Sequence, residues 1–149
     1  MNASTIPVLI PFTFLLAALL IPLAGMLRKG FAQVLAVAAS GFTLFISVTG
    51  LFRVLDEGPL HHYMAGWLPP FGIEFVFDPL SAFFCALISA VSVLVLIHAG
   101  KSTAHEIPDK VVPFFSLAML LLAGLTGMVM TGDLFNLYVF LEIGALAGY

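Results

Sequence analysis

The last stretch of the chain, Asp133–Tyr149, reads DLFNLYVFLEIGALAGY, and Glu142 is its only charged residue after Asp133. If a membrane helix begins at Leu134, Glu142 lies about 12 Å below that end, at about 1.5 Å per residue. That depth is close to the middle of a hydrocarbon layer about 30 Å thick. A carboxylate there costs on the order of 3 kcal/mol or more. It persists when it is protonated, paired or facing a wet cavity, and each of these states is useful to a proton carrier.

The faces of this helix follow from its period of about 100° per residue. Four residues share the face of Glu142: Phe135, Tyr138, Leu146 and Tyr149. The two tyrosine hydroxyls can donate hydrogen bonds or hold water near the carboxylate. Gly144 and Gly148 form a small-xxx-small pair on nearly the opposite face, which suits close contact with another helix. Glu142 is therefore either a residue in proton transfer or a structural carboxyl bonded to a neighbouring helix.

Composition places the chain in the membrane class, because 62% of its residues are hydrophobic and only 9% are charged, against about 25% charged in a soluble domain. The single cysteine, Cys85, lies in an apolar run and cannot form an internal disulfide. Met1–Leu27 has no basic residue at its start, and its apolar run is too long for a cleaved signal peptide. We therefore interpret it as a spanning helix.

The apolar runs predict an all-α integral membrane protein with one membrane domain over residues 1–149. We expect helices at about 6–27, 31–52, 79–99, 111–130 and 134–149. The fifth run extends about 24 Å, which is short for a span, and it has no basic flank. We therefore expect a chain that is incomplete at its C-terminus, either a fragment or a split gene product.

Residues 53–78 form the longest segment between the expected spans. Ile73–Asp78 partly alternates between apolar and polar residues, and Pro69–Gly72 carries turn residues. This pattern predicts a short β-hairpin at the membrane surface, with Trp67 at the depth of the headgroups. His61 and His62 lack carboxylate or Cys partners at ligand spacing, so we expect a solvated pair and no metal site. The connector 98–110 is also expected to be polar and solvated, although His105 could relay protons.

Topology follows from the basic residues, because Lys and Arg are enriched in cytoplasmic loops. Most of them lie in the first and third connectors, at Arg28, Lys29, Lys101 and Lys110, and only Arg53 lies in the second. The expected location is a prokaryotic cytoplasmic membrane, with the N-terminus and residues 53–78 outside. The fifth helix then enters from outside, with Asp133 placed to cap its start.

The segment Gly127–Glu142, GMVMTGDLFNLYVFLE, resembles the fourth-to-fifth helix region of the proton-conducting antiporter-like subunits. Complex I, membrane-bound hydrogenases and Mrp-type sodium/proton antiporters share these subunits. Thr131–Asn136 followed by Val139–Glu142 is most similar to the branch that holds the D-type subunits of Mrp antiporters and the hydrogenases. Three upstream pieces resemble the family's external hairpin and third-helix start: Trp67, Phe71–Ile73 and Asp78–Ser81. The resemblance covers nearly the whole chain and implies the N-terminal part of such a protein.

The resemblance implies that Glu142 is the family's fifth-helix glutamate, paired with a lysine on a broken seventh helix that this chain lacks. Asp133, Asn136, Tyr138 and Tyr149 would support it. It also implies that the chain works with other membrane subunits of an antiporter or respiratory-type complex, translocating H⁺ and, as a second candidate ion, Na⁺. Other interpretations are a proton-pumping subunit of a redox-driven complex and a structural subunit without transport of its own.

The chain itself shows no catalytic chemistry. It has no Cys cluster for an iron–sulfur centre and no paired intramembrane His for haem. We therefore expect no cofactor, no metal and no nucleic-acid partner, and any enzymatic activity would belong to the partner subunits.

Overall fold

The computed structural model describes residues 5–67 and 72–149 of the chain. A short 3₁₀ turn, Met64–Gly66, follows the first strand. The helices and strands, in chain order, are α1 (Ile6–Leu27), α2 (Lys29–Glu57), β1 (Leu60–Tyr63), β2 (Glu74–Phe77), α3 (Pro79–Glu106), α4 (Val111–Met130) and α5 (Leu134–Gly148).

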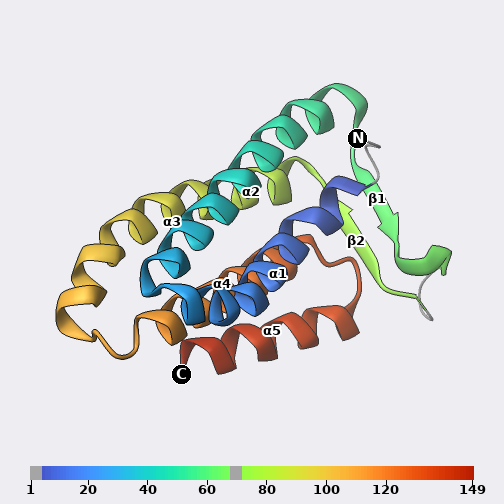
Figure 1. The fold of residues 1–149 in the computed structure, drawn as a ribbon. Coiled ribbons are helices and arrows are strands. Elements are labelled where there is room, and N and C mark those ends of the chain that lie inside the picture. The colour runs from blue at the N-terminus through green and yellow to red at the C-terminus, as the bar shows by residue number, and fades with distance from the viewer. Residues whose placement is uncertain (1–4, 68–71) are drawn as a thin grey trace.

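The long helices form a bundle in which α4 packs against α1 and α5, while α2 packs against α1 and α3. Figure 1 shows the β-hairpin and the α4–α5 turn at one end of the bundle. The α1–α2 and α3–α4 connections lie at the other end. Successive helices therefore alternate in direction, as expected for a chain that crosses a membrane repeatedly.

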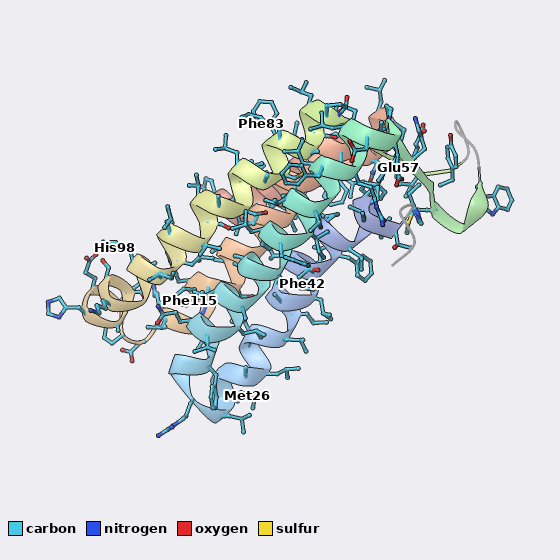
Figure 2. All side chains as sticks on the ribbon, turned by 90° about the horizontal axis from the view of Figure 1, so that it is seen from above. Met26, Phe42, Glu57, Phe83, His98 and Phe115 are labelled. Carbon is cyan, nitrogen blue, oxygen red and sulfur yellow. The ribbon has the colours of Figure 1, made fainter. Side chains whose placement is uncertain are left out.

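Within the described residues, α1, α2, α3 and α4 are long and apolar enough to cross a membrane, whereas α5 is apolar but has only 15 residues. Large apolar side chains such as Phe42 and Phe83 project outward along the bundle (Figure 2) and are half exposed or more. The helical membrane class is thus confirmed, with a multi-pass arrangement. Exposed apolar side chains along a helix bundle suit contact with lipid or with other membrane helices.

Two helices are longer than the sequence predicts. The expected helix 31–52 is α2, Lys29–Glu57, and the expected helix 79–99 is α3, Pro79–Glu106. The predicted loop 53–78 therefore begins only at Gly58, and most of the predicted connector 98–110 is helical. The hydropathy of the runs marks where apolar residues end, but backbone hydrogen bonding continues past that point. Side-chain pairs one turn apart support the added turns: Arg53 with Glu57, and Ser102 with Glu106.

The predicted hairpin is present. β1 and β2 pair antiparallel, with Leu60 opposite Phe77 and Tyr63 opposite Glu74. Phe75 and Phe77 are buried on one side, as the alternation predicts. Trp67 is exposed, and the turn expected at Pro69–Gly72 lies mostly outside the described residues.

The start of α3 is fixed by a capping box directly after β2. Asp78 accepts a hydrogen bond from the Ser81 backbone N–H at 2.7 Å, and Ser81 Oγ accepts from the Asp78 N–H at 2.8 Å. The bond from the Ser81 N–H holds the pKa of Asp78 below its usual value. The hairpin is therefore joined rigidly to the third helix.

Candidate functional site

Helix α5 carries Glu142, and its start is set by Asp133. The Asp133 Oδ1 atom accepts a hydrogen bond from the Asn136 N–H at 2.7 Å, so Asp133 is the N-cap of α5. The sequence predicted this cap, and the structure confirms it. The capped end is the end nearest the hairpin (Figure 1).

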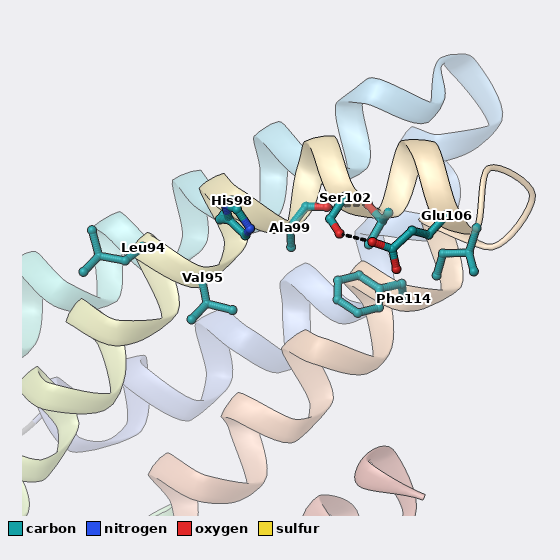
Figure 3. Close-up of a pocket in the computed structure, with 9 residues that line it drawn as sticks. Leu94, Val95, His98, Ala99, Ser102, Glu106 and Phe114 are labelled. Atoms are coloured by element: carbon teal, nitrogen blue, oxygen red, sulfur yellow. Dashed lines mark hydrogen bonds between the residues drawn. The ribbon is translucent and has the colours of Figure 1, made fainter.

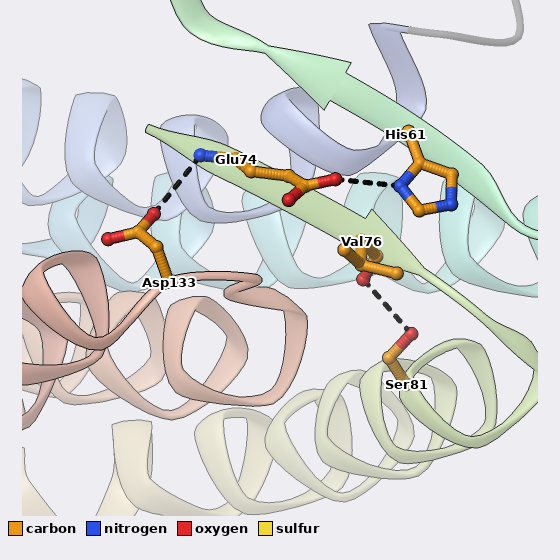
Figure 4. A network of polar contacts seen from close by, with 5 residues as sticks. All are labelled: His61, Glu74, Val76, Ser81 and Asp133. Atoms are coloured by element: carbon orange, nitrogen blue, oxygen red, sulfur yellow. Dashed lines mark hydrogen bonds and ion pairs between the residues drawn. The ribbon is translucent and has the colours of Figure 1, made fainter. Parts of the chain in front are cut away.

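The same carboxylate holds the hairpin onto α5. Asp133 Oδ2 accepts a hydrogen bond from the Glu74 N–H at 3.1 Å, and the Glu74 carbonyl accepts one from the Gly132 N–H at 2.8 Å. Phe75 also forms an isolated bridge with Thr131. Figure 4 shows Asp133 reaching across to the backbone of β2. Both backbone groups of Glu74 are therefore engaged by the α4–α5 turn.

The Glu74 side chain points to the other strand. Its Oε1 atom lies 2.8 Å from His61 Nδ1 (Figure 4). Sequence reasoning assigned His61 to a solvated pair with His62 and missed this contact, because the strand register that brings His61 near Glu74 is not local. Among the described residues no group of three or more His, Cys, Asp or Glu side chains could hold a metal ion.

Helix α5 packs against α4 through glycines. A Cβ added at Gly124 would lie 2.7 Å from both Cα and N of Gly144, so the two backbones nearly touch there. A Cβ at Gly127 would overlap the ring of Phe140. Phe140 also packs edge-on against Phe75 of the hairpin, with ring centroids 5.9 Å apart. These contacts fix how α5 is rotated about its axis.

That rotation turns the Glu142 face away from α4. Phe135 is 70% exposed, Tyr138 61% and Leu146 75%. Glu142 is half-buried, and its carboxylate has no hydrogen-bond or ion-pair partner within residues 5–67 and 72–149. The structure thus brings Glu142, Tyr138 and Tyr149 to one open face without joining them by hydrogen bonds.

The other predicted site residues lie elsewhere. Gly144 lies against Gly124, whereas Gly148 is exposed and has only Leu121 close to its position. Asn136 is buried, and lies about 120° around the helix from Glu142. Its side chain therefore does not share the open face, and only its backbone N–H joins it to Asp133. Sequence reasoning missed Gly124 and Gly127 of α4 as contact residues, because their facing partners on α5 cannot be identified from one helix.

A separate groove of about 510 Å³ lies between α3 and α4, with Phe114 on its wall. His98, Ser102 and Glu106 line the groove (Figure 3). The Ser102 hydroxyl donates a hydrogen bond to the Glu106 carboxylate at 2.7 Å. His98 and Glu106 are both exposed. None of the residues around this groove belongs to α5, so it is not part of the candidate site.

Removal of the Asp133 carboxylate should loosen both the cap and the hairpin. We expect Asp133→Ala to destabilise the start of α5 by about 0.5–2 kcal/mol, the usual value of an N-cap. Hydrogen exchange of the Asn136 and Glu74 amides should become faster together. The matched variant Asp133→Asn keeps an oxygen acceptor and should show a smaller change. Unchanged exchange at both amides in Asp133→Ala would contradict this account.

Comparison with known proteins shows similarity to membrane subunits. The chain is 42% identical over 146 residues to NADH-quinone oxidoreductase subunit N of Desulforudis audaxviator. The aligned region covers 95% of this chain and 28% of that relative. It is 30% identical over 148 residues to the D-type subunit of the Na⁺/H⁺ antiporter of Bacillus subtilis, covering 99% of this chain and 29% of the relative. No family model matches the chain.

Two solved structures share the fold. A chain of the membrane-bound sulfane sulfur reductase, an archaeal respiratory membrane complex, matches with a TM-score of 0.85 and 31% identity, over 99% of this chain and 29% of that one. A chain of the Mrp complex from a Dietzia species matches with a TM-score of 0.81 and 29% identity, over 100% of this chain and 27% of that one. The chain therefore spans little more than a quarter of the length of these relatives.

Proposed function

Since the chain is a homologue of the antiporter-like membrane subunits, we propose that it takes part in cation/proton translocation and that Glu142 carries the proton. The observation that supports this most directly is the open face of α5. Glu142 lies there among exposed apolar residues, without a partner in the described part of the chain. An ionisable group inside a membrane is by default a functional candidate.

The proposed chemistry needs only a change of partner at Glu142. Removal of water favours the neutral carboxyl, and an approaching ammonium group favours the carboxylate. A cation that moves away from Glu142 lets it take up a proton, and a returning cation expels the proton. Tyr138, on the same face, is placed to hold water on the proton's path. The cation belongs to a segment or subunit that packs on this face.

The partners that fit are other membrane subunits of an antiporter or respiratory-type complex, together with H⁺ and Na⁺ as the transported ions. The face of α5 that carries Phe135 and Leu146 is apolar and uncovered, which suits another membrane helix. Transport by a Glu142→Gln variant is the direct test of the proposed role.

A second candidate is a proton-translocating subunit of a redox-driven complex. It is favoured by the 42% identity to subunit N of an NADH-quinone oxidoreductase and by the likeness to a respiratory reductase. Membrane vesicles separate the two cases. An imposed sodium gradient should move protons through an antiporter, whereas a redox-driven pump should move protons only when an electron donor is supplied.

We also propose that the N-terminus and the hairpin face outward, from the distribution of basic residues. On a Cys85-free background, a cysteine at position 56 should react with a membrane-impermeant maleimide in intact cells. A cysteine at position 105 should react only after the membrane is opened. Asp56 and His105 are both exposed, and they lie near the C-terminal ends of α2 and α3, at opposite ends of the bundle. A difference in labelling between the two positions therefore reports the side of the membrane and not burial. Labelling of 105 and not 56 in sealed cells would reverse the topology.

A further inference from the structure

The pair of His61 and Glu74 lies on the hairpin, at the joint that holds the start of α5, and the function proposed for α5 does not use it. Nδ1 of His61 is 2.8 Å from Oε1 of Glu74 (Figure 4). The His61 side chain is 47% exposed, whereas that of Glu74 is only 15% exposed. Water can therefore exchange a proton with the imidazole, while the carboxylate that it meets is mostly removed from water.

Glu74 is the residue through which the hairpin binds the α4–α5 turn. Its backbone N–H donates to Asp133 Oδ2 at 3.1 Å, and its carbonyl accepts from the Gly132 N–H at 2.8 Å. Its side chain also lies against Gly132, because a Cβ there would be 3.0 Å from Glu74 Cγ and 3.1 Å from Oε2. A change in the position of this carboxylate therefore acts directly on the turn that begins α5.

Among the described residues, the other ionisable groups that face this pair carry no positive charge. Asp133, which caps α5, adds a second carboxylate at the joint. Removal from water, the charge of Glu74 and a hydrogen bond with Glu74 raise the pKa of Tyr63 on β1, so its hydroxyl stays neutral near pH 7. At the far end of β2, Asp78 is bound in the capping box of α3. Helices α1 and α4, which also contact the hairpin, have no titratable side chain.

His61 is thus the group that decides the charge balance of the joint. Histidine ordinarily changes its charge between about pH 5 and 8. On the acid side, the imidazolium of His61 donates to Glu74 and balances its charge. As the pH rises, the imidazole becomes neutral and leaves two carboxylates at the joint. A carboxylate removed from water is costly without an opposite charge nearby.

We propose that His61 and Glu74 form a pH-sensitive latch, which holds the hairpin tightly on the start of α5 at acid pH and loosens it as the pH rises. The latch lies at the hairpin end of the bundle and responds to the pH on that side of the membrane. The packing of Phe75 on Phe140 carries no charge, so the loosening is confined to the polar joint. The latch needs the contact between the hairpin and α5 but not proton transfer by Glu142.

Hydrogen exchange at about pH 5.5 and pH 8 tests the latch, in membranes that contain the protein. The amides of Glu74 and Gly132 make the two backbone bonds of the joint, and the Ser81 amide, bound to Asp78, is the internal control. Protection is measured against an unfolded peptide at the same pH, which removes the effect of pH on exchange itself. We expect protection of Glu74 and Gly132 to be roughly three- to tenfold lower at the higher pH, the ratio for one net hydrogen bond. Protection of Ser81 should stay unchanged.

Four variants separate the latch from other groups. His61→Gln keeps a hydrogen-bond donor but cannot titrate, so it should show the low protection at both pH values. His61→Lys stays positively charged and should show the high protection at both. His62→Gln is the matched control, because successive side chains of β1 point to opposite sides, and it should keep the pH response. Glu142→Gln should also keep it, even if it abolishes transport.

Three outcomes would overturn the proposal. Equal protection of Glu74 and Gly132 at the two pH values in the unmodified chain would show that the joint does not respond to pH. A pH response that survives in His61→Gln would assign the response to another group. Loss of Ser81 protection in step with the other two amides would show that the whole hairpin region loosens, and not this joint.

Discussion

Glu142→Gln should abolish or strongly reduce coupled ion transport while the complex assembles normally. Glutamine keeps the shape and most of the hydrogen-bonding capacity of a neutral carboxyl, but it cannot gain or lose a proton. A structural carboxyl would tolerate this change. The open face of α5 gives Glu142 no partner in the described part of the chain, so the substitution breaks no contact there.

The measurement is proton or sodium movement in membrane vesicles, with a blot for the assembled complex beside it. Glu142→Asp is the matched variant, because it keeps the titrating group and shortens its reach. We expect it to retain part of the activity. Full transport by Glu142→Gln at normal assembly would leave only the structural interpretation of this residue.

Gly124→Ala should displace α5 from α4. The added methyl group would lie 2.7 Å from backbone atoms of Gly144, and backbone atoms cannot turn aside as a flexible side chain can. Overpacking of this kind costs about 1–3 kcal/mol. Helix α5 packs chiefly on α4, so within the described residues this interface contributes most of what holds α5 in place.

Gly41→Ala is the control, because nothing lies within 4 Å of a Cβ at that position. A disulfide between cysteines at positions 121 and 148, on a Cys85-free background, reports the docking. Leu121 Cδ1 lies 3.8 Å from a Cβ built at Gly148. Disulfide formation should fall in Gly124→Ala and stay unchanged in Gly41→Ala. Equal disulfide yield in the two variants would show that the glycine contact does not position α5.

The sequence alone was enough to predict properties that depend on neighbouring residues. The low share of charged residues gives the membrane class, because few charges can be placed in a hydrocarbon layer. The helical period puts Phe135, Tyr138 and Leu146 on one face, and the structure leaves that face exposed. The cap at Asp133 depends on a residue and the turn that follows it. The alternation of apolar and polar residues at Ile73–Asp78 also involves only neighbouring residues, and it predicts strand β2.

Properties that depend on distant residues required the tertiary structure. The bond from the Glu74 N–H to Asp133 joins residues 59 positions apart, and no local pattern marks it. Sequence reasoning grouped Asn136 with Glu142, but the docked hairpin and α1 enclose its side chain on another face. The period of α5 defines its faces, whereas the tertiary contacts of Gly124 with Gly144 and of Gly127 with Phe140 decide which face turns outward. Side-chain periodicity is a local property, while the rotation of a helix is set by the backbones that it meets.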